Sequence, residues 1–161
     1  MSLHVAAVDL YDPVQAAIWL DLLDHYARDP MGGGEGLSDY AKLNLVHTIR
    51  QVPGFHGALA WLDGEAVGLI DCFAGFSTFA AKPLLNVHDI VVHEDFRRQG
   101  IARALLAHVE AVARARGCCK LTLEVLEGNL GARRAYLEFG FEGYQLDPAM
   151  GQALFMEKKL G

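Results

Sequence analysis

The sequence predicts a mixed α/β fold, with a sheet of about seven strands and helices on both of its faces. The dipeptide Asp63-Gly64 lies between two apolar runs, which is typical of an antiparallel hairpin. A strand–helix–strand order between Leu84 and Leu126 predicts two parallel strands, because parallel neighbours need a long crossover connection. With 161 residues, the chain is expected to form one domain over residues 1–161.

The N-terminal half is expected to contain two helices among its strands. Asp12 and Ser38 are good N-cap residues, and each precedes an apolar pattern of helical period. Four glycines and one proline within residues 29–36 predict a loop between these helices. The expected elements are a strand Leu3–Asp9, a helix from Pro13 to about Tyr26, a helix from Asp39 to about Gln51, and the two hairpin strands within Phe55–Phe76.

The C-terminal half is expected to supply the crossover and the last strands. Its main helix has one apolar face and ends at Gly117, a common C-terminal stop. The expected elements are a strand Leu84–Val92, a helix from about Gln99 to Arg116, a strand Lys120–Leu126, a short helix from Asn129 to Gly140, and two strands, Phe141–Gln145 and Ala153–Lys158.

The composition argues against several classes of protein. The formal net charge of −6 disfavours nucleic acid as the main partner, since phosphate binding needs clustered Lys and Arg. No apolar run approaches the roughly 20 residues of a membrane span. Met1–Asp12 contains no Lys or Arg, so we expect neither a secretory signal nor a transit peptide, and a cytoplasmic location. The three cysteines and seven histidines show no metal-ligand spacing, so no metal is expected.

Charge is distributed unevenly along the chain. Met1–His93 contains 11 acidic and 4 basic residues, a net charge of −7, whereas Glu94–Gly161 contains 9 and 10, a net charge of +1. The acidic first part favours a positively charged amine over an acidic small molecule.

The segment Asp89–Ala102 carries the strongest chemical signal. It predicts a strand end, a basic turn with Gly100, and the N-terminus of a helix. Free backbone N–H groups and the helix dipole would meet at this turn, which is an arrangement that binds phosphate. The alternative is an ordinary turn with solvated arginines.

Two motifs resemble those of the GCN5-related N-acetyltransferases. Arg97-x-x-Gly100-x-Ala102 is similar to the family's Q/R-x-x-G-x-G/A signature, and Asn129-x-x-Ala132-x-x-x-Tyr136-x-x-x-Gly140-Phe141 is similar to its second motif. The resemblance implies an acyl-CoA N-acyltransferase fold, with acetyl-CoA bound where strands four and five splay apart. It also implies a set of cofactor-binding residues: Ile90, Val91, Val92, Arg97, Arg98, Gln99, Gly100, Ile101, Ala102, Arg103, Asn129, Ala132 and Tyr136.

The implied reaction is acetyl transfer from acetyl-CoA to a primary amine, by direct attack. The resemblance makes Tyr136 the acid that protonates the departing thiolate, although a core tyrosine would follow the same helical pattern. His88 and Asp89 are the candidates for the base, with Glu124 in reserve. Strand alternation predicts that His88 and Asp89 point to opposite faces. The Val92 N–H is the expected oxyanion donor.

The sequence does not identify the amine that would accept the acetyl group. The run Gly75–Lys82 and the pair His88-Asp89 are similar to the diamine and thialysine acetyltransferase branch, but His88 stands where that branch has Glu. A small-molecule amine is the expected partner. The alternatives are a protein-lysine or N-terminal acetyltransferase, or a non-catalytic acetyl-CoA-binding module. Gly32–Gly36 is expected to be a loop over the acceptor site, and the apolar segment Phe73–Phe79 suggests a possible homodimer contact.

Overall fold

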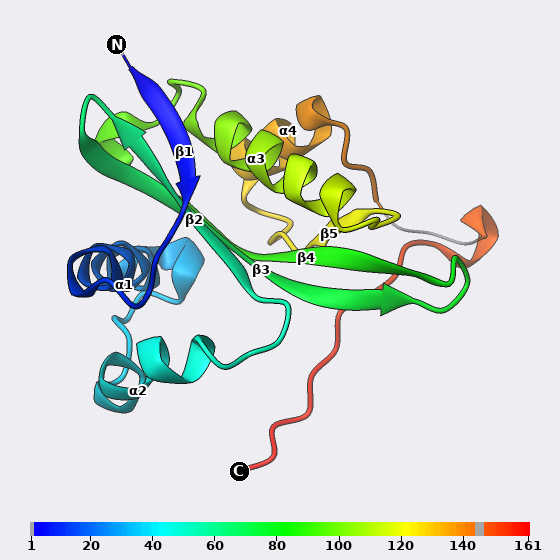
Figure 1. Ribbon diagram of the computed structural model, residues 1–161. Coiled ribbons are helices and arrows are strands. Elements are labelled where there is room, and N and C mark those ends of the chain that lie inside the picture. The colour runs from blue at the N-terminus through cyan, green and yellow to red at the C-terminus, as the bar shows by residue number, and fades with distance from the viewer. Residues whose placement is uncertain (1, 144–146) are drawn as a thin grey trace.

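A computed structural model describes residues 2–143 and 147–161 (Figure 1). Its single sheet has the order β1-β2-β3-β4-β5. The first four strands are antiparallel to their neighbours, and β5 runs parallel to β4, so the predicted mixed sheet is confirmed. The strands are β1 (Leu3–Ala7), β2 (His56–Leu62), β3 (Glu65–Ser77), β4 (Lys82–Val92) and β5 (Leu121–Leu123).

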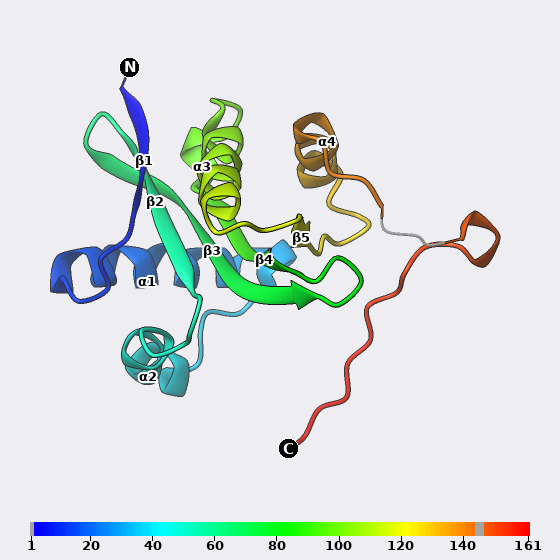
Figure 2. The same cartoon turned by 45° about the vertical axis from the view of Figure 1, so that its right-hand side comes forward.

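Helices cover both faces of the sheet, as predicted. Figures 1 and 2 show α1 and α2 on one face and α3 and α4 on the other. The Asp12 carboxylate and the Ser38 hydroxyl cap α1 and α2, which confirms both predicted caps. The helices are α1 (Pro13–Arg28), α2 (Asp39–Ile49), α3 (Ile101–Ala115) and α4 (Leu130–Phe139), with short 3-10 turns η1 (Pro30–Gly32), η2 (Glu94–Phe96) and η3 (Pro148–Met150).

Two apolar clusters hold these layers together. One joins α1 and α2 to the sheet around the fully buried Trp19, and the other joins α3 and α4 to the opposite face around Ile70 and Leu105. Each large buried side chain contributes about 2 kcal/mol of transfer free energy. Gly68 allows α3 to approach closely, because a Cβ there would lie 2.6 Å from the Val91 carbonyl oxygen and 3.3 Å from the Ile101 side chain.

The strands β4 and β5 separate as the resemblance implied. They pair only where Leu85–Val87 meets Leu121–Leu123. The strand β4 then continues to Val92, whereas β5 has already ended. This divergence leaves the edge of β4 beyond Val87 without a partner strand in the described residues and provides the frame of the candidate site.

The predicted count of about seven strands is not confirmed, since residues 2–143 and 147–161 form five. The prediction for Ala153–Lys158 is wrong: this segment forms no strand and leads away from the sheet (Figure 2). Its apolar side chains are therefore exposed, Leu154 by 86%. Residues 141–143 also form no strand, and the rest of Phe141–Gln145 lies outside the described residues. Alternation of apolar and polar residues favours extended backbone, but a β-strand also needs a neighbouring strand with which to form hydrogen bonds.

Within residues 2–143 and 147–161, no helix has the length and apolar character to cross a membrane. Over the same residues, no three His, Cys, Asp or Glu side chains gather in a way that would hold a metal ion.

Candidate functional site

The open edge of β4 presents backbone groups of Ile90 and Val92. The His93 N–H donates to the Val67 carbonyl at 2.8 Å, and Val92 lies opposite Gly68 in the antiparallel register. Because hydrogen-bonding direction alternates along a strand, the N–H and C=O groups of Ile90 and Val92 point away from β3. They face the side where β5 has ended, so an extended ligand can pair with them. The backbone N–H and C=O groups of Val91 instead point towards β3, and the Val91 side chain is buried.

The turn after β4 leads into a helix end that no side chain caps. Arg98 and Gly100 both have left-handed backbone, with φ values of 64° and 78°. In residues 2–143 and 147–161, no side chain caps the start of α3, so the N–H groups of residues 101–103 point out of the helix end. A Cβ on Gly100 would meet no atom within 4 Å, which means that open space lies in front of this turn. The geometry suits a phosphate group.

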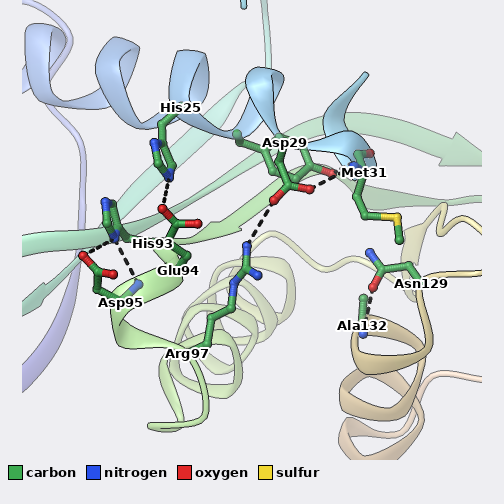
Figure 3. A network of polar contacts seen from close by, with 10 residues as sticks. His25, Asp29, Met31, His93, Glu94, Asp95, Arg97, Asn129 and Ala132 are labelled. Atoms are coloured by element: carbon green, nitrogen blue, oxygen red, sulfur yellow. Dashed lines mark hydrogen bonds and ion pairs between the residues drawn. The ribbon is translucent and has the colours of Figure 1, made fainter. Parts of the chain in front are cut away.

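The predicted arginines of this turn have different surroundings. The Arg97 guanidinium lies 3.5 Å from the Asp29 carboxylate, at the end of α1 (Figure 3). Arg103 lies over the Phe139 ring of α4, 6.0 Å from its centroid. Arg98 and Gln99 are exposed. Only Arg98 among the three arginines therefore has a side chain without a protein partner in the described part of the chain.

The same turn is held to α1 by a second group of contacts. The His25 and His93 rings stack with their centroids 4.6 Å apart, and His25 Nε2 lies 3.9 Å from a Glu94 carboxylate oxygen. Figure 3 shows this group beside the Arg97–Asp29 pair. Asp29 also accepts the Met31 N–H at 2.9 Å. It therefore connects the turn after β4, through Arg97, to η1, which is the first part of the glycine-rich loop.

A buried pair of carboxyl groups lies deeper in the sheet. Asp71 on β3 and Asp89 on β4 are direct cross-strand partners, and Asp71 is fully buried. The Trp19 indole N–H donates to Asp71 Oδ1 at 2.8 Å, whereas no N–H or hydroxyl group of the described residues donates to Oδ2. The Asp89 carboxyl lies within hydrogen-bonding reach of Asp71. Burial and the mutual repulsion of the charges raise the pKa of Asp71 well above its ordinary value, and burial also raises the pKa of Asp89.

A β-bulge corrects the prediction that His88 and Asp89 point to opposite faces. The register shifts so that Asp71 pairs with Asp89 but Cys72 pairs with Val87, which leaves His88 as the extra residue. The His88 ring contacts the Phe73 ring edge-on at 5.3 Å, on the side of the α1 cluster. Asp89 lies on that side as well, next to Asp71. The bulge therefore brings both candidate bases to one face, with His88 exposed and Asp89 partly buried.

Two tyrosines of the described residues, Tyr26 on α1 and Tyr136 on α4, have raised pKa values. Burial, with a contribution from Tyr26, raises the pKa of Tyr136 to about 12. Burial and the charges of Asp89 and Asp29 raise the pKa of Tyr26, whose hydroxyl donates to the Met31 carbonyl at 3.5 Å. Tyr136 packs edge-on against Phe141 and belongs to the apolar cluster around α3. It is therefore part of the core, as the helical pattern of α4 predicted.

The second motif positions Tyr136 through the start of α4. Asn129 Oδ1 accepts the Ala132 N–H at 3.3 Å and so caps this helix. The Asn129 NH₂ group is left as the part of that side chain that can reach a ligand. Glu124, the reserve base, is exposed just after β5.

Sequence reasoning missed Asp71, Trp19 and Tyr26. Asp71 did leave one signal, because it is the single charged residue within the apolar run Ala66–Phe73. Trp19 and Tyr26 follow the ordinary apolar pattern of α1, and nothing in the sequence marks them as site residues.

Comparison with known proteins relates this chain to acetyltransferases. Residues 19–141 match the model of the acetyltransferase (GNAT) family. Streptothricin acetyltransferase from Streptomyces lavendulae is 38% identical over 95 residues, which are 59% of this chain and 48% of that protein. Thialysine N-epsilon-acetyltransferase from Caenorhabditis elegans is 31% identical over 81 residues, 50% of each chain. The matches thus span about half the length of these two relatives.

A solved structure extends the likeness to the whole chain. AAC(6')-Iy, in complex with the bisubstrate analogue CoA-S-monomethyl-acetylneamine, superposes with a TM-score of 0.79. The superposition covers 99% of this chain and 100% of that one, at 20% sequence identity. This likeness concerns the fold.

Proposed function

The chain belongs to the acetyltransferase (GNAT) family, and on that premise we propose that it transfers the acetyl group of acetyl-CoA to a primary amine of a small molecule. One observation carries the proposal. The open edge of β4, with the free backbone groups of Ile90 and Val92, leads directly from the buried carboxyl groups to the uncapped start of α3. An extended ligand with a phosphate at one end and a reactive group at the other fits this path.

The residues present fit acetyl-CoA. The N–H groups of residues 101–103 and the left-handed backbone at Arg98 and Gly100 suit the pyrophosphate. Ile90 and Val92 offer backbone groups to the pantetheine arm, and the Asn129 amide would donate to it from the opposite side. When bound, acetyl-CoA supplies the thioester that the acceptor amine attacks.

Deprotonating the amine is the larger demand on the protein. An alkylammonium with a pKa of ~10.4 costs roughly 4 to 5 kcal/mol to deprotonate at neutral pH, whereas a thiol with a pKa of ~8.5 leaves with less help. Asp89 accepts the proton of the ammonium, which frees the nitrogen lone pair for attack on the thioester carbon. The Val92 N–H stabilises the oxyanion as the N–C bond forms.

The C–S bond then breaks, and the thiolate must receive a proton. Tyr136 supplies it and regains one from the nitrogen that has become the amide, so the protons balance. Burial supports this assignment, because a pKa of about 12 keeps the Tyr136 hydroxyl protonated throughout the neutral range.

Two observations support a small cationic acceptor. The first 93 residues contain 11 acidic and 4 basic residues, which gives them a net charge of −7. The names of two relatives identify small acceptors, streptothricin and thialysine.

Thiol release from acetyl-CoA tests this proposal. The acceptor panel comprises diamines, polyamines, amino acids, aminoglycosides and a lysine peptide, after calorimetry has established that acetyl-CoA binds. We expect turnover with at least one small cationic amine. Turnover of the lysine peptide alone would contradict the small-molecule acceptor, and binding without any turnover would favour the non-catalytic module.

A further inference from the structure

We infer that Asp71 and Asp89 act as one proton-accepting unit, in which the buried Asp71 positions and tunes the Asp89 carboxyl that meets the acceptor amine. The role in turnover rests on the proposed function, whereas the sharing of a proton between the two groups does not. Asp71 is fully buried, so it acts through Asp89 and makes no contact with the acceptor itself.

The backbone fixes this pair. The bulge at His88 brings Asp89 directly opposite Asp71, and the Trp19 indole holds Asp71 Oδ1 at 2.8 Å. On the other side, β2 contributes Gly57, where a Cβ would lie 3.0 Å from the same oxygen. Oδ2 receives no hydrogen bond from the described residues, and Asp89 lies beside Asp71 on the adjoining strand. Two buried carboxyl groups at hydrogen-bonding distance are stable when they hold one proton between them.

The charged and titratable groups around the pair compensate its negative charge only in part. The ion pairs of the described residues include neither carboxyl. Burial and the charge of Asp89 raise the pKa of Tyr26 on α1, and His88, the neighbour of Asp89 on β4, partly offsets the rise that burial gives to the pKa of Asp89. Cys72 adjoins Asp71 on β3, where burial raises the pKa of the thiol to about 12. A cationic amine at the site would add a further positive charge next to that of His88.

Proton transfer to the pair follows from this arrangement. In the reactive form both carboxyl groups are ionised, and the ammonium of the acceptor gives one proton to Asp89. The products are a neutral amine and a pair that holds one shared proton, and the proton later passes to solvent. Removal of the negative charge at Asp71 should make Asp89 a weaker base.

Two variants with opposite expected effects test the inference. In the pH profile of kcat/KM, Asp71→Asn should move the acidic limb to lower pH by about one unit or more, because the repelling charge is lost. Trp19→Phe should move the same limb to higher pH, because the ionised form loses its hydrogen-bond donor. A purely structural role would lower the rate without moving the limb. Unmoved limbs, or shifts in the same direction, would overturn the inference.

A second measurement needs no acceptor. Infrared titration of the protein without substrates should show the C=O band of a protonated carboxylic acid persisting above about pH 6, where ordinary carboxyl groups are ionised. Asp71→Asn should abolish that band, whereas Asp89→Asn should keep it and move its titration to lower pH, because Asp71 stays buried but loses the repelling charge. Its absence from the wild-type protein would overturn the shared proton. If the band is present and no amine is turned over, the shared proton stands and only the proposed function fails.

Discussion

The two ends of the site are built in different ways. The phosphate-type end uses consecutive backbone groups of one turn, from Arg98 to residue 103, and it is open to solvent. The proposed chemical end uses side chains from several elements, with Asp71 on β3, Asp89 on β4 and Tyr136 on α4, and these side chains are buried or partly buried. One end is therefore specified locally and tolerates water, whereas the other depends on long-range packing that excludes it.

The difference predicts that ligand binding and chemistry can be separated by mutation. Backbone N–H groups cannot be deleted by a side-chain change, so the first end is sensitive to added bulk or charge. Carboxyl and hydroxyl groups are deleted by near-isosteric changes, so the second end can lose its chemistry while its shape is kept. Each prediction below uses this contrast.

The largest effect is expected at the phosphate-type end. Gly100→Glu should weaken acetyl-CoA binding by at least about 100-fold, since it adds a negative charge and strains a backbone with a φ of 78°. Calorimetry measures the loss. Gly117→Glu is a matched control, because Gly117 follows the other end of α3 with a φ of 75° and similarly open surroundings. Equal losses in both variants would show that backbone strain, and not the site, is responsible.

Loss of the base should come next. Asp89→Asn should lower kcat by about 10²–10³-fold and leave the Kd of acetyl-CoA unchanged, because the change removes a proton acceptor and little volume. Steady-state kinetics and calorimetry measure the two quantities. A kcat close to the wild-type value would remove Asp89 from the mechanism and leave His88 as the candidate.

A smaller effect is expected from the acid. Tyr136→Phe should lower kcat about tenfold, because a thiol leaves with less help than an amine needs to lose its proton. The loss should be uniform up to about pH 9, since the pKa of Tyr136 is raised to about 12. A pH profile of kcat checks this. Unchanged kcat at every pH would assign Tyr136 to packing alone.

The smallest effect lies outside both ends and concerns stability. His56 and His108 share a contact with Nε2 atoms 2.9 Å apart, and burial, His108 and Arg116 lower the pKa of His56 to about 4. The stability from these neutral rings is complete above the unfolded pKa near 6.5 and is lost as pH falls towards about 4.

Because His56 is only half-buried, this loss should be on the order of 1 kcal/mol. Thermal melts between about pH 4 and pH 8 should show a shallower acid dependence for His56→Gln than for the wild type. Parallel curves for the two proteins would mean that the pair contributes nothing to acid sensitivity.

The two ends also differ in how well the sequence predicted them. The turn around Gly100 was predicted from local residues, because its geometry depends on a strand end, a glycine and a helix start that adjoin in the chain. The crossover and both helix caps followed from similar local signals. Tyr136 and Asp89 were predicted as candidates through the family resemblance.

The carboxyl pair was not predicted, because it depends on register. Asp71 meets Asp89 only because β4 gains one residue at His88, and no local pattern marks that bulge. The same bulge overturned the alternation prediction for His88 and Asp89. The prediction for Ala153–Lys158 was wrong for a related reason, since this segment has the alternation of a strand but no strand of the described residues pairs with it.

The most direct test compares acetyl-CoA affinity and thiol release in the wild type, Gly100→Glu and Asp89→Asn, with the best acceptor of the panel. The account predicts that Gly100→Glu loses affinity, and that Asp89→Asn keeps wild-type affinity but loses turnover. An Asp89→Asn protein that turns over normally, or that loses affinity as strongly as Gly100→Glu, would contradict the division of the site into these two ends.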